Sequence, residues 1–447
     1  MPLMDQIVVK VINYMSRERS ILKKIRKTVR RAYQSRYYQE KLDALEVKPA
    51  HIRSFEDFQE KIPITYRNDI SLKARSPFDL LALDYRKETM IYGQTSGTTT
   101  GEAVPVIMTK RELESSIKIA LKLPVFRAYI GPGDKVALVF PYTRTFAGRT
   151  ADLMAQFSKT LVVPIGTRTN IFPPAQVVGT LLAIRPTILG VIPTDAFALA
   201  QILRDRGMDP KDLGVKQIVM GAEPCSKNRA ELIRQMYEAE NVFTFVGQNE
   251  VGLPGIPCLK GNLHLPTVAM YAELYTEDGE PTNEYGVPVV PVITPLFRKA
   301  MPVLRYWTDD LVILEKNCPC GLKMPIYNIL GRTLTKVDLP NFERKGPLMP
   351  TDLENILFED KIYGVWYQFH IYEDHLKIIV EHNDKTEFDQ LAASISKRFE
   401  KKMQMPCECE MVPLKTLYDY YEIRPGKPLS RVIDHRQSEG AQIIEGA

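Results

Sequence analysis

The sequence predicts an α/β protein with a large N-terminal domain, in which helices flank mixed and parallel sheets, and a small α+β domain at the C-terminus. Short apolar runs alternate with helical patterns from about residue 90 to 335, and after about residue 338 the pattern changes to helix, hairpin, helix. The chain has 447 residues, about three times a common domain length. We therefore expect two domains, 1–335 and 336–447.

The strands of the large domain are expected at four short apolar runs that end in Gly or Pro. These runs are 135–142, 160–166, 187–193 and 216–224. Helical patterns at 198–208 and 229–240 lie among them. This alternation predicts a largely parallel sheet, and loops at the ends of such strands are where open α/β sheets bind ligands.

The small domain is expected to begin with a helix at 351–360, with Thr351 as its N-cap and Glu354 in the capping-box position. A hairpin is expected at 366–382 and an amphipathic helix at 388–403.

Composition and charge exclude several classes of protein. Hydrophobic residues make up 45% and charged residues 25% of the chain, the balance of a soluble globular protein. The lack of a long apolar run or a signal pattern predicts a cytoplasmic protein without a membrane partner. Residues 17–36 hold nine Lys or Arg and one acid, Glu18. We interpret this segment as a solvated helix and not a nucleic-acid site, because no aromatic residue is interleaved with the charges before Tyr33.

The segment from Thr95 to Gly101, TSGTTTG, is the strongest local signal. Its hydroxyl side chains and glycine backbone are what a loop around a polyphosphate needs. It lacks the Lys-Ser/Thr of a Walker loop and the GxGxxG spacing of a dinucleotide fingerprint. By composition alone, a solvated turn is equally compatible with it.

Further motifs make the chain similar to a known family. TSGTTTGE resembles the phosphate-binding signature of the adenylate-forming superfamily of acyl-CoA synthetases, luciferases and peptide-synthetase adenylation domains. Its companions resemble those of the phenylacetate–CoA ligase-like branch, in family order over nearly the whole chain. They lie at 37–70, 220–233, 247–255, 301–311, 329–333 and 426–436.

This resemblance implies ATP-dependent activation of a carboxylic acid as an acyl-adenylate, followed by transfer to a thiol, with ATP, Mg²⁺ and coenzyme A as cofactors. It implies that Glu250, Arg332 and Lys427 are catalytic, with Glu250 also placing Mg²⁺ and Lys427 bridging the acyl carboxylate and the α-phosphate. It assigns the nucleotide contacts to Thr95, Ser96, Gly97, Thr98, Thr99, Gly101, Gly221, Ala222, Glu223, Pro224, Gln248, Asn249 and Asp310. It assigns the acyl pocket to Tyr142, Phe146 and Gly148, although aromatic residues there are equally suited to a core.

The chain also departs from the family pattern. Asn249 replaces a hydroxyl residue, and Asp309 replaces the usual glycine before Asp310. Thr333 and Leu334 stand where an acidic or lysine hinge usually follows Arg332. These changes leave adenylation credible and bear mainly on the second half-reaction.

The cysteines raise the question of a metal. Cys318 and Cys320 form a CxC pair, and Cys258 and His264 follow the Glu250 motif. The resemblance places a metal cluster at these positions in some members, and three thiolates with one imidazole suit a structural Zn²⁺ site. Packed, reduced cysteines are the alternative. Cys407 and Cys409 are a rival pair without a nearby histidine.

Three functions remain open on the sequence. The first is an aryl-acid–CoA ligase, whose partners are a small carboxylic acid and coenzyme A, with a homodimer left open as the assembly. The second passes the acyl group to an amine or a carrier-protein thiol. The third is a degenerate acyl-adenylate-binding protein, against which the retention of Glu250, Asp310, Arg332 and Lys427 argues.

Overall fold

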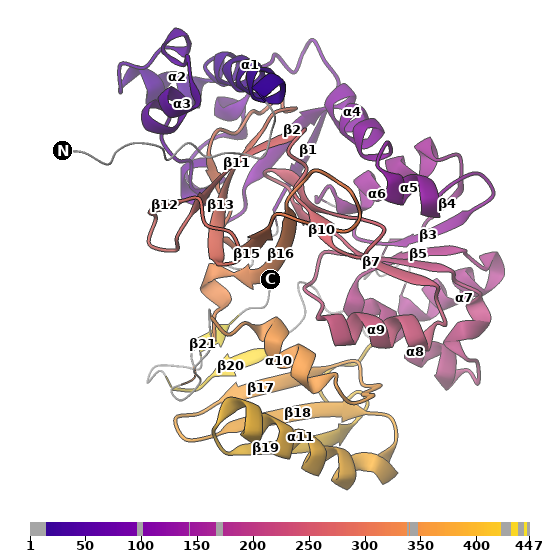
Figure 1. The fold of residues 1–447 in the computed structure, drawn as a ribbon. Helices are drawn as coiled ribbons and strands as arrows, with labels where there is room; N and C mark the ends of the chain where they lie inside the picture. The colour runs from indigo at the N-terminus through magenta and orange to yellow at the C-terminus, as the bar shows by residue number, and fades with distance from the viewer. Residues whose placement is uncertain are drawn as a thin grey trace. The chain divides into compact units, whose positions relative to one another are not determined.

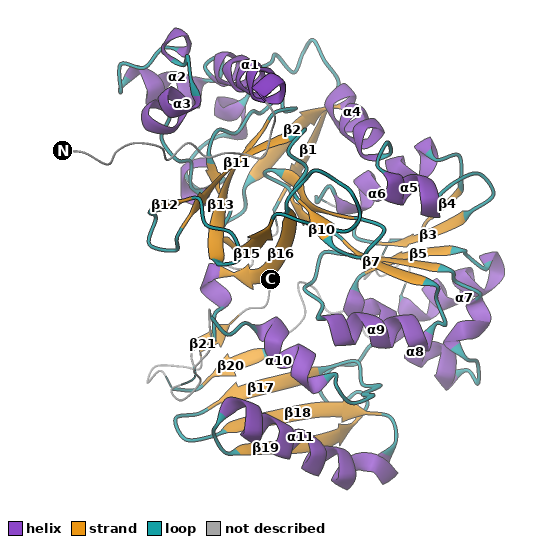
Figure 2. Ribbon diagram, viewed as in Figure 1, coloured by secondary structure: helices purple, strands orange, loops and turns teal. Residues whose placement is uncertain are grey.

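The computed structural model describes residues 15–95, 102–142, 144–166, 173–337, 339, 347–421, 431–436 and 442–444. The chain forms two compact units, each assembled from three segments. Unit 1 comprises residues 1–129, 143–157 and 245–330, and unit 2 comprises residues 130–142, 158–244 and 331–447. Helices and strands alternate through much of the chain (Figures 1 and 2), so the predicted α/β class is confirmed.

Unit 1 begins with helices. Amphipathic α1 buries the apolar stripe Ile21, Ile25 and Val29, while most of its basic residues lie at the surface. Strands β1 and β2 then form an antiparallel pair in which Gln94 is the partner of Pro105. The helices are α1 (Met15–Ala32), α2 (Arg36–Asp43), α3 (Phe55–Lys61), α4 (Lys110–Ala120), α5 (Pro124–Tyr129) and α6 (Ala147–Phe157), and the pair is β1 (Met90–Gln94) and β2 (Pro105–Thr109).

A nine-stranded sheet follows in the order β12-β11-β13-β15-β16-β10-β9-β8, with β14 pairing β13. Its neighbouring strands pair antiparallel, for example β11 with β13 and β9 with β10. Its strands are β8 (Val246–Gln248), β9 (Gly252–Pro257), β10 (Leu263–His264), β11 (Met270–Tyr275), β12 (Pro281–Thr282), β13 (Pro288–Pro295), β14 (Tyr306–Trp307), β15 (Asp310–Glu315) and β16 (Ile326–Arg332).

Unit 2 contains the predicted parallel sheet, in the order β4-β3-β5-β6-β7, with every neighbouring pair parallel. The four apolar runs predicted as strands form its first four members. Helices α8 and α9 overlap the predicted helices but begin five and two residues earlier, at Pro193 and Lys227. The elements are β3 (Lys135–Val139), β4 (Leu161–Pro164), α7 (Pro174–Ile184), β5 (Ile188–Val191), α8 (Pro193–Asp205), β6 (Gln217–Met220), α9 (Lys227–Met236) and β7 (Asn241–Thr244).

The C-terminal part of unit 2 is a five-stranded mixed sheet, β19-β18-β17-β20-β21, with α11 packed against β19 (Figure 2). The predicted hairpin is the antiparallel pair β17–β18. The elements are α10 (Pro350–Leu357), β17 (Tyr367–Ile371), β18 (Leu376–His382), α11 (Phe388–Met403), β19 (Cys407–Pro413), β20 (Val432–Asp434) and β21 (Gln442–Ile444). Short 3₁₀ turns are η1 (Pro49–His51), η2 (Arg67–Ile70), η3 (Pro77–Leu80), η4 (Pro210–Leu213), η5 (Thr333–Thr335) and η6 (Lys385–Glu387).

One local prediction is wrong. Helix α10 is capped at Met349, not at Thr351, and Pro350 occupies its first turn. Asp352 provides the returning contact, because its carboxylate accepts the Met349 N–H at 2.9 Å. This frees the Glu354 side chain for its contacts with Arg229 and Arg431.

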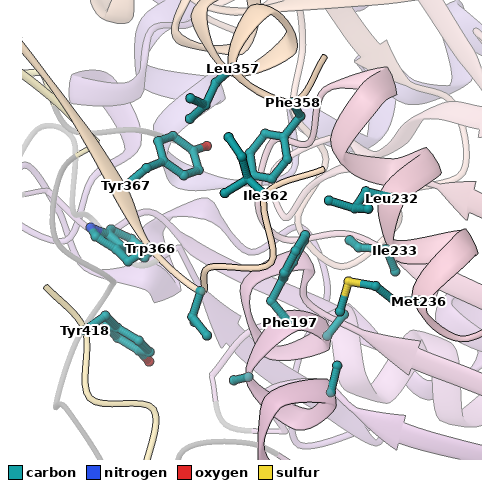
Figure 3. Close-up of a cluster of buried hydrophobic side chains, with 14 of the residues drawn as sticks. Phe197, Leu232, Ile233, Met236, Leu357, Phe358, Ile362, Trp366, Tyr367 and Tyr418 are labelled. Atoms are coloured by element: carbon teal, nitrogen blue, oxygen red, sulfur yellow. The ribbon is translucent and has the colours of Figure 1, made fainter. Parts of the chain in front are cut away.

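One hydrophobic core runs through both parts of unit 2. Phe197 of α8 and Leu232 and Met236 of α9 belong to the same buried cluster as Phe358 and Trp366 (Figure 3). The Phe197 and Phe358 rings lie 5.8 Å apart between centroids, within the range of favourable aromatic pairs. The parallel sheet and the C-terminal sheet of unit 2 therefore share a packed interior.

Candidate active site

The predicted site residues divide between the two units. Unit 1 holds Thr95, Phe146, Gly148, Gln248, Asn249, Glu250 and Asp310, and unit 2 holds Tyr142, Gly221, Ala222, Glu223, Pro224 and Arg332. Ser96, Gly97, Thr98, Thr99, Gly101 and Lys427 lie outside the described residues.

Thr95 anchors the start of the predicted phosphate loop. Its backbone N–H donates to the Val104 carbonyl at 2.9 Å, and its hydroxyl accepts the Val104 N–H at 2.9 Å. Arg67 Nη1 also donates to this hydroxyl, at 3.4 Å. Thr95 is thus tied to Val104 next to the β1–β2 pair, in which Gln94 is the partner of Pro105.

Glu250 is buried and held by two donors. Its Oε1 is 3.0 Å from Arg67 Nη2 and accepts the Tyr306 hydroxyl at 2.9 Å. Burial, and after it the charge of Glu250, raises the pKa of Tyr306 well above its usual value, so this phenol stays a donor. Arg67 touches both Thr95 and Glu250 and therefore places a cation between the phosphate loop and the acid. Neither Arg67 nor Tyr306 was predicted, although both lie in motifs that resemble the family.

Gln248 and Asp310 form a buried pair. Gln248 Nε2 donates to Asp310 Oδ2 at 2.7 Å and to the Thr308 carbonyl at 3.0 Å. Asp309, which stands where the family usually has glycine, has a φ of +58°. This left-handed conformation is why glycine suits the position, and Asp is one of the few other residues that tolerate it. The substitution therefore keeps the turn that carries Asp310.

Asn249 links three segments of unit 1. Its Oδ1 accepts the Phe146 N–H at 3.2 Å, and its Nδ2 donates to the Gln94 carbonyl at 3.0 Å. Its own carbonyl accepts from Arg298 Nη2 at 2.6 Å, and burial lowers the pKa of Arg298 to about 10. A serine or threonine hydroxyl is too short to serve both side-chain contacts, so this departure from the family pattern ties the end of β1 to the start of α6.

Phe146 and Gly148 sit at the start of α6, and both are buried. The Phe146 ring belongs to a cluster with Val106, Met108 and Leu113. It packs closely on Gly93, where a Cβ would come within 2.6 Å of a ring carbon. Phe146 is therefore part of a packed cluster of unit 1, and its role in an acyl pocket stays a prediction.

In unit 2, the predicted adenine segment follows β6. Ala222 has a φ of +67°, and this turn directs Glu223 into the unit. The Glu223 carboxylate accepts the Thr194 N–H at 3.1 Å and the Thr194 hydroxyl at 2.7 Å. Its Oε1 lies 3.2 Å from Arg229 Nη1 and 2.5 Å from Arg431 Nη2. Burial opposes its ionisation, but Arg431 and Arg229 outweigh this and lower the pKa of Glu223 to about 2. Its carboxylate is thus fully engaged by protein groups.

Arg332 ends β16 and precedes the 3₁₀ turn η5. Its carbonyl accepts the Thr335 hydroxyl at 2.9 Å. Leu334, at the family's usual hinge position, is 64% exposed, so this position is not fixed by packing.

The structure brings Cys258, His264, Cys318 and Cys320 together, with their ligand atoms all within 4.8 Å of one another. The Cys258 and Cys318 sulfurs are 3.9 Å apart, and Cys320 Sγ is 3.4 Å from His264 Nε2. Tetrahedral Zn²⁺ at normal bond lengths would place two sulfurs about 3.8 Å apart and a sulfur and a nitrogen about 3.5 Å apart. The spacing therefore fits a single tetrahedral ion.

The surroundings of this cluster fit the same donor set. His264 Nδ1 donates to the Met324 carbonyl at 2.9 Å, which leaves the Nε2 lone pair facing the thiols. Gly261 and Gly321 have φ values of +76° and +79° and form the turns after the first cysteine and the CxC pair. Burial opposes ionisation of Cys318, but hydrogen bonds with Asn262, Cys320 and His264 lower its pKa to about 6, so the thiolate form is favoured.

The rival pair has a different environment. Cys407 and Cys409 lie two residues apart on β19, and burial raises the pKa of Cys409 to about 12. Within the part of the chain that the structure describes, the cluster around Cys318 is the only group of three or more His, Cys, Asp or Glu that could hold a metal. Among the residues that the structure describes, no helix is long and apolar enough to cross a membrane.

Comparison with known proteins agrees with these motifs. The chain is 30% identical over 335 residues to phenylacetate–coenzyme A ligase of Thermus thermophilus, covering 72% of this chain and 70% of that protein. It is 26% identical over 364 residues to phenylacetate–coenzyme A ligase of Pseudomonas putida, covering 79% and 78%. No protein-family model matches the chain.

The fold also has solved counterparts. The crystal structure of 2-hydroxyisobutyryl-CoA ligase in the postadenylation state with 2-HIB-AMP superposes with a TM-score of 0.82 at 19% identity, covering 98% of this chain and 94% of that one. Fold and motifs together define an adenylate-forming enzyme. The chain belongs to the phenylacetate–CoA ligase-like branch of that superfamily, and it is an AMP-forming acid–thiol ligase.

Proposed function

We propose that this protein activates a small carboxylic acid with Mg²⁺-ATP and transfers the acyl group to coenzyme A. In the first step, a carboxylate oxygen attacks the α-phosphorus and pyrophosphate leaves, which forms the acyl-adenylate. In the second step, the thiolate of coenzyme A attacks the acyl carbon and AMP leaves. The observation that carries the proposal is the 30% identity to a phenylacetate–coenzyme A ligase over 72% of the chain.

The residues of unit 1 support the first step. Arg67, whose guanidinium contacts Thr95 and Glu250, supplies positive charge beside the phosphate loop, where the reaction gathers negative charge. Among the described residues, no hydrogen bond is found to Oε2 of Glu250, and a hard cation prefers such a carboxylate oxygen. Glu250 would hold Mg²⁺, which neutralises the phosphate charge when bound. Asp310, oriented by Gln248, would accept the ribose hydroxyls.

The remaining predicted roles complete the proposal. Lys427 bridges the acyl carboxylate and the α-phosphate, and Arg332 lies near the ribose. Gly221, Ala222 and Pro224 meet the adenine by backbone and small side chains, because the Glu223 carboxylate is already engaged. Cys258, His264, Cys318 and Cys320 bind one structural Zn²⁺. The large domain ends near residue 335, the residues from 336 onward form the small domain, and the enzyme acts in the cytoplasm.

The direct test is an acid-dependent pyrophosphate-release screen over aryl, aliphatic and amino acids, run with and without coenzyme A. We expect release with a compact acid and formation of its CoA thioester. Pyrophosphate without thioester would point to an amine or carrier-protein acceptor. No release with any acid would point to a binding protein without turnover and would overturn the proposal.

Replacing Glu250 with Gln is expected to slow adenylate formation about 10- to 100-fold and to raise the Mg²⁺ concentration needed for half-maximal rate. The amide keeps the shape and the contact with Tyr306 but removes the charge that faces Arg67 and the metal. Stopped-flow pyrophosphate release against Mg²⁺ concentration measures both effects. The matched control is Glu315→Gln on β15, an exposed side chain that contacts Asn328. An unchanged Mg²⁺ dependence in Glu250→Gln would refute this role.

A further inference from the structure

Two histidines in the C-terminal part of unit 2 share a hydrogen bond that lies outside the proposed chemistry. His370 belongs to β17, and His435 directly follows β20, the neighbouring strand (Figure 1). His370 Nδ1 and His435 Nε2 are 3.0 Å apart, and the two ring planes differ by 13°. In a neutral pair, one ring donates its N–H and the other accepts it. The two side chains therefore join the two strands.

This contact lies at one end of a short parallel ladder. Residues 369–371 of β17 pair with residues 432–434 of β20, and the His435 N–H donates to the Ile371 carbonyl at 2.9 Å. The Tyr372 ring stacks on that of His435, with centroids 4.5 Å apart, and so fixes the plane of the imidazole. Because so short a ladder has few backbone hydrogen bonds, one further bond between side chains matters to how firmly β20 is held.

Protonation of both rings is incompatible with this contact. A protonated imidazole carries an N–H on each nitrogen, so two such rings would face each other donor to donor, with two positive charges, across 3.0 Å. His370 also has a buried Nε2 without a hydrogen-bond partner in the described part of the chain, and an N–H there would lack an acceptor. Burial, followed by the charges of His435 and Lys377, lowers the pKa of His370. The intact pair therefore holds at most one proton beyond its neutral form.

The charge that faces His370 comes from the adjacent strand β18. Lys377 lies opposite His370 in the register of the β17–β18 pair, and its ammonium is 2.9 Å from Glu410 of β19. The hydrogen bond with Glu410, and after it the charges of Glu410 and Glu408, raise the pKa of Lys377. His370 therefore faces a persistent cation, while the two acids of β19 act on the lysine.

The charge beside His435 has the opposite sign. Asp434 precedes it in the chain, and the hydrogen bond with Arg436, followed by the charges of Arg436 and His435, lowers the pKa of this carboxyl. The one extra proton that the pair can hold is therefore favoured on His435, next to an acid. A second proton would have to enter His370, next to Lys377.

We propose that the His370–His435 hydrogen bond is a pH-sensitive fastening between β17 and β20, intact while the pair holds at most one extra proton and broken when both rings are protonated. Once β20 is released, the two imidazoles are separate, each with the usual pKa of about 6.5. The released form then binds more protons than the intact form below that pH. By linkage, the attachment of β20 is fully present above about pH 7 and weakens as the pH falls through about 6. This fastening does not depend on which reaction the enzyme catalyses.

Hydrogen exchange of the full-length protein, measured from about pH 7.5 to about pH 5, tests the fastening. In the wild type, the opening equilibrium constant of the amides of residues 433–435, corrected for intrinsic exchange, should rise about three- to tenfold per pH unit below about pH 6, because opening takes up about one proton.

The His435→Gln variant should remove this pH dependence. The glutamine amide can donate to His370 Nδ1 or accept from it in either protonation state of that ring, and position 435 is exposed, so the substitution does not disturb the core. We expect an opening constant within about threefold of wild type at neutral pH and a change of less than about threefold on acidification.

A second variant and a control complete the test. His370→Asn places an amide where Nδ1 stands and removes the buried ring, so it should give the same flat profile. The control, His375→Gln, removes another imidazole of the C-terminal part, one that lies 2.7 Å from Asp374 and stacks on Tyr372. It should keep the wild-type pH dependence. A flat wild-type profile, an undiminished rise in His435→Gln, or loss of the rise in His375→Gln would each overturn the proposal.

Discussion

Lys427→Ala should slow adenylate formation by two to three orders of magnitude, about the loss expected when one charged transition-state contact is removed. The reason is that the first half-reaction joins two anions, the acyl carboxylate and the α-phosphate, and the lysine ammonium bridges them. The second half-reaction has no such pair to bridge. Transfer of a preformed acyl-adenylate to coenzyme A should therefore stay within about threefold of wild type, by the same reasoning on where charge develops.

Single-turnover experiments of each half-reaction measure this difference. Lys402→Ala provides a matched control, because this exposed lysine of α11 pairs only with Glu359 among the described residues. Equal losses in both half-reactions would remove the assigned role from Lys427. A similar loss in Lys402→Ala would show that the effect reflects the net charge of the small domain.

Removal of the proposed zinc should have the second-largest effect, on stability. We expect the purified protein to carry about one equivalent of zinc, as a closed site with four ligands requires. Cys318→Ser should release it and lower the free energy of unfolding by at least about 3 kcal/mol, since metal binding contributes directly to folding. For a unit of this size, that loss corresponds to roughly 6 to 12 °C in Tm.

Elemental analysis and thermal unfolding, with and without added zinc, check this prediction. Cys409→Ser in the rival pair is the control and should keep the metal. Metal-free wild-type protein of full stability would refute the site. Loss of zinc in Cys409→Ser, with retention in Cys318→Ser, would move the site to β19.

The parallel sheet was predictable because its signal is local. Each strand is a short apolar run bounded by Gly or Pro, and β3, β4, β5 and β6 lie within the runs chosen on that basis. The N-cap of α10 was not predictable in this way. Thr351 and Glu354 match the pattern of a capping box, but the helix starts two residues earlier, with Met349 as the N-cap, Pro350 in the first turn and Asp352 making the returning contact. Two capping patterns therefore overlap in this sequence. In the structure Glu354 does not cap the helix but pairs with Arg229 and Arg431.

The residues of the candidate site also fall into two groups, those that a local motif predicts and those that only the fold brings together. Residues such as Glu250 and Asp310 were predicted because they stand in recognisable motifs. Arg67 was not predicted because its role rests on the ion pair with Glu250. The two residues are far apart in the sequence and meet only in the folded chain. Arg431 was missed for the same reason, since its partner Glu223 is recruited from another part of unit 2.

The interleaving of the two units has a consequence for the newly synthesised chain. Unit 1 lacks its main sheet until residues 245–330 have been made, and unit 2 lacks its C-terminal part until residues 331–447 follow. Phe197 and Trp366 belong to the same core, and Trp366 is synthesised about 10 to 30 s after Phe197 at ordinary rates of translation. During that time the apolar faces of α8 and α9 are uncovered on the ribosome. A chain cut at residue 335 would lack Phe358 and Trp366 and would never cover this surface.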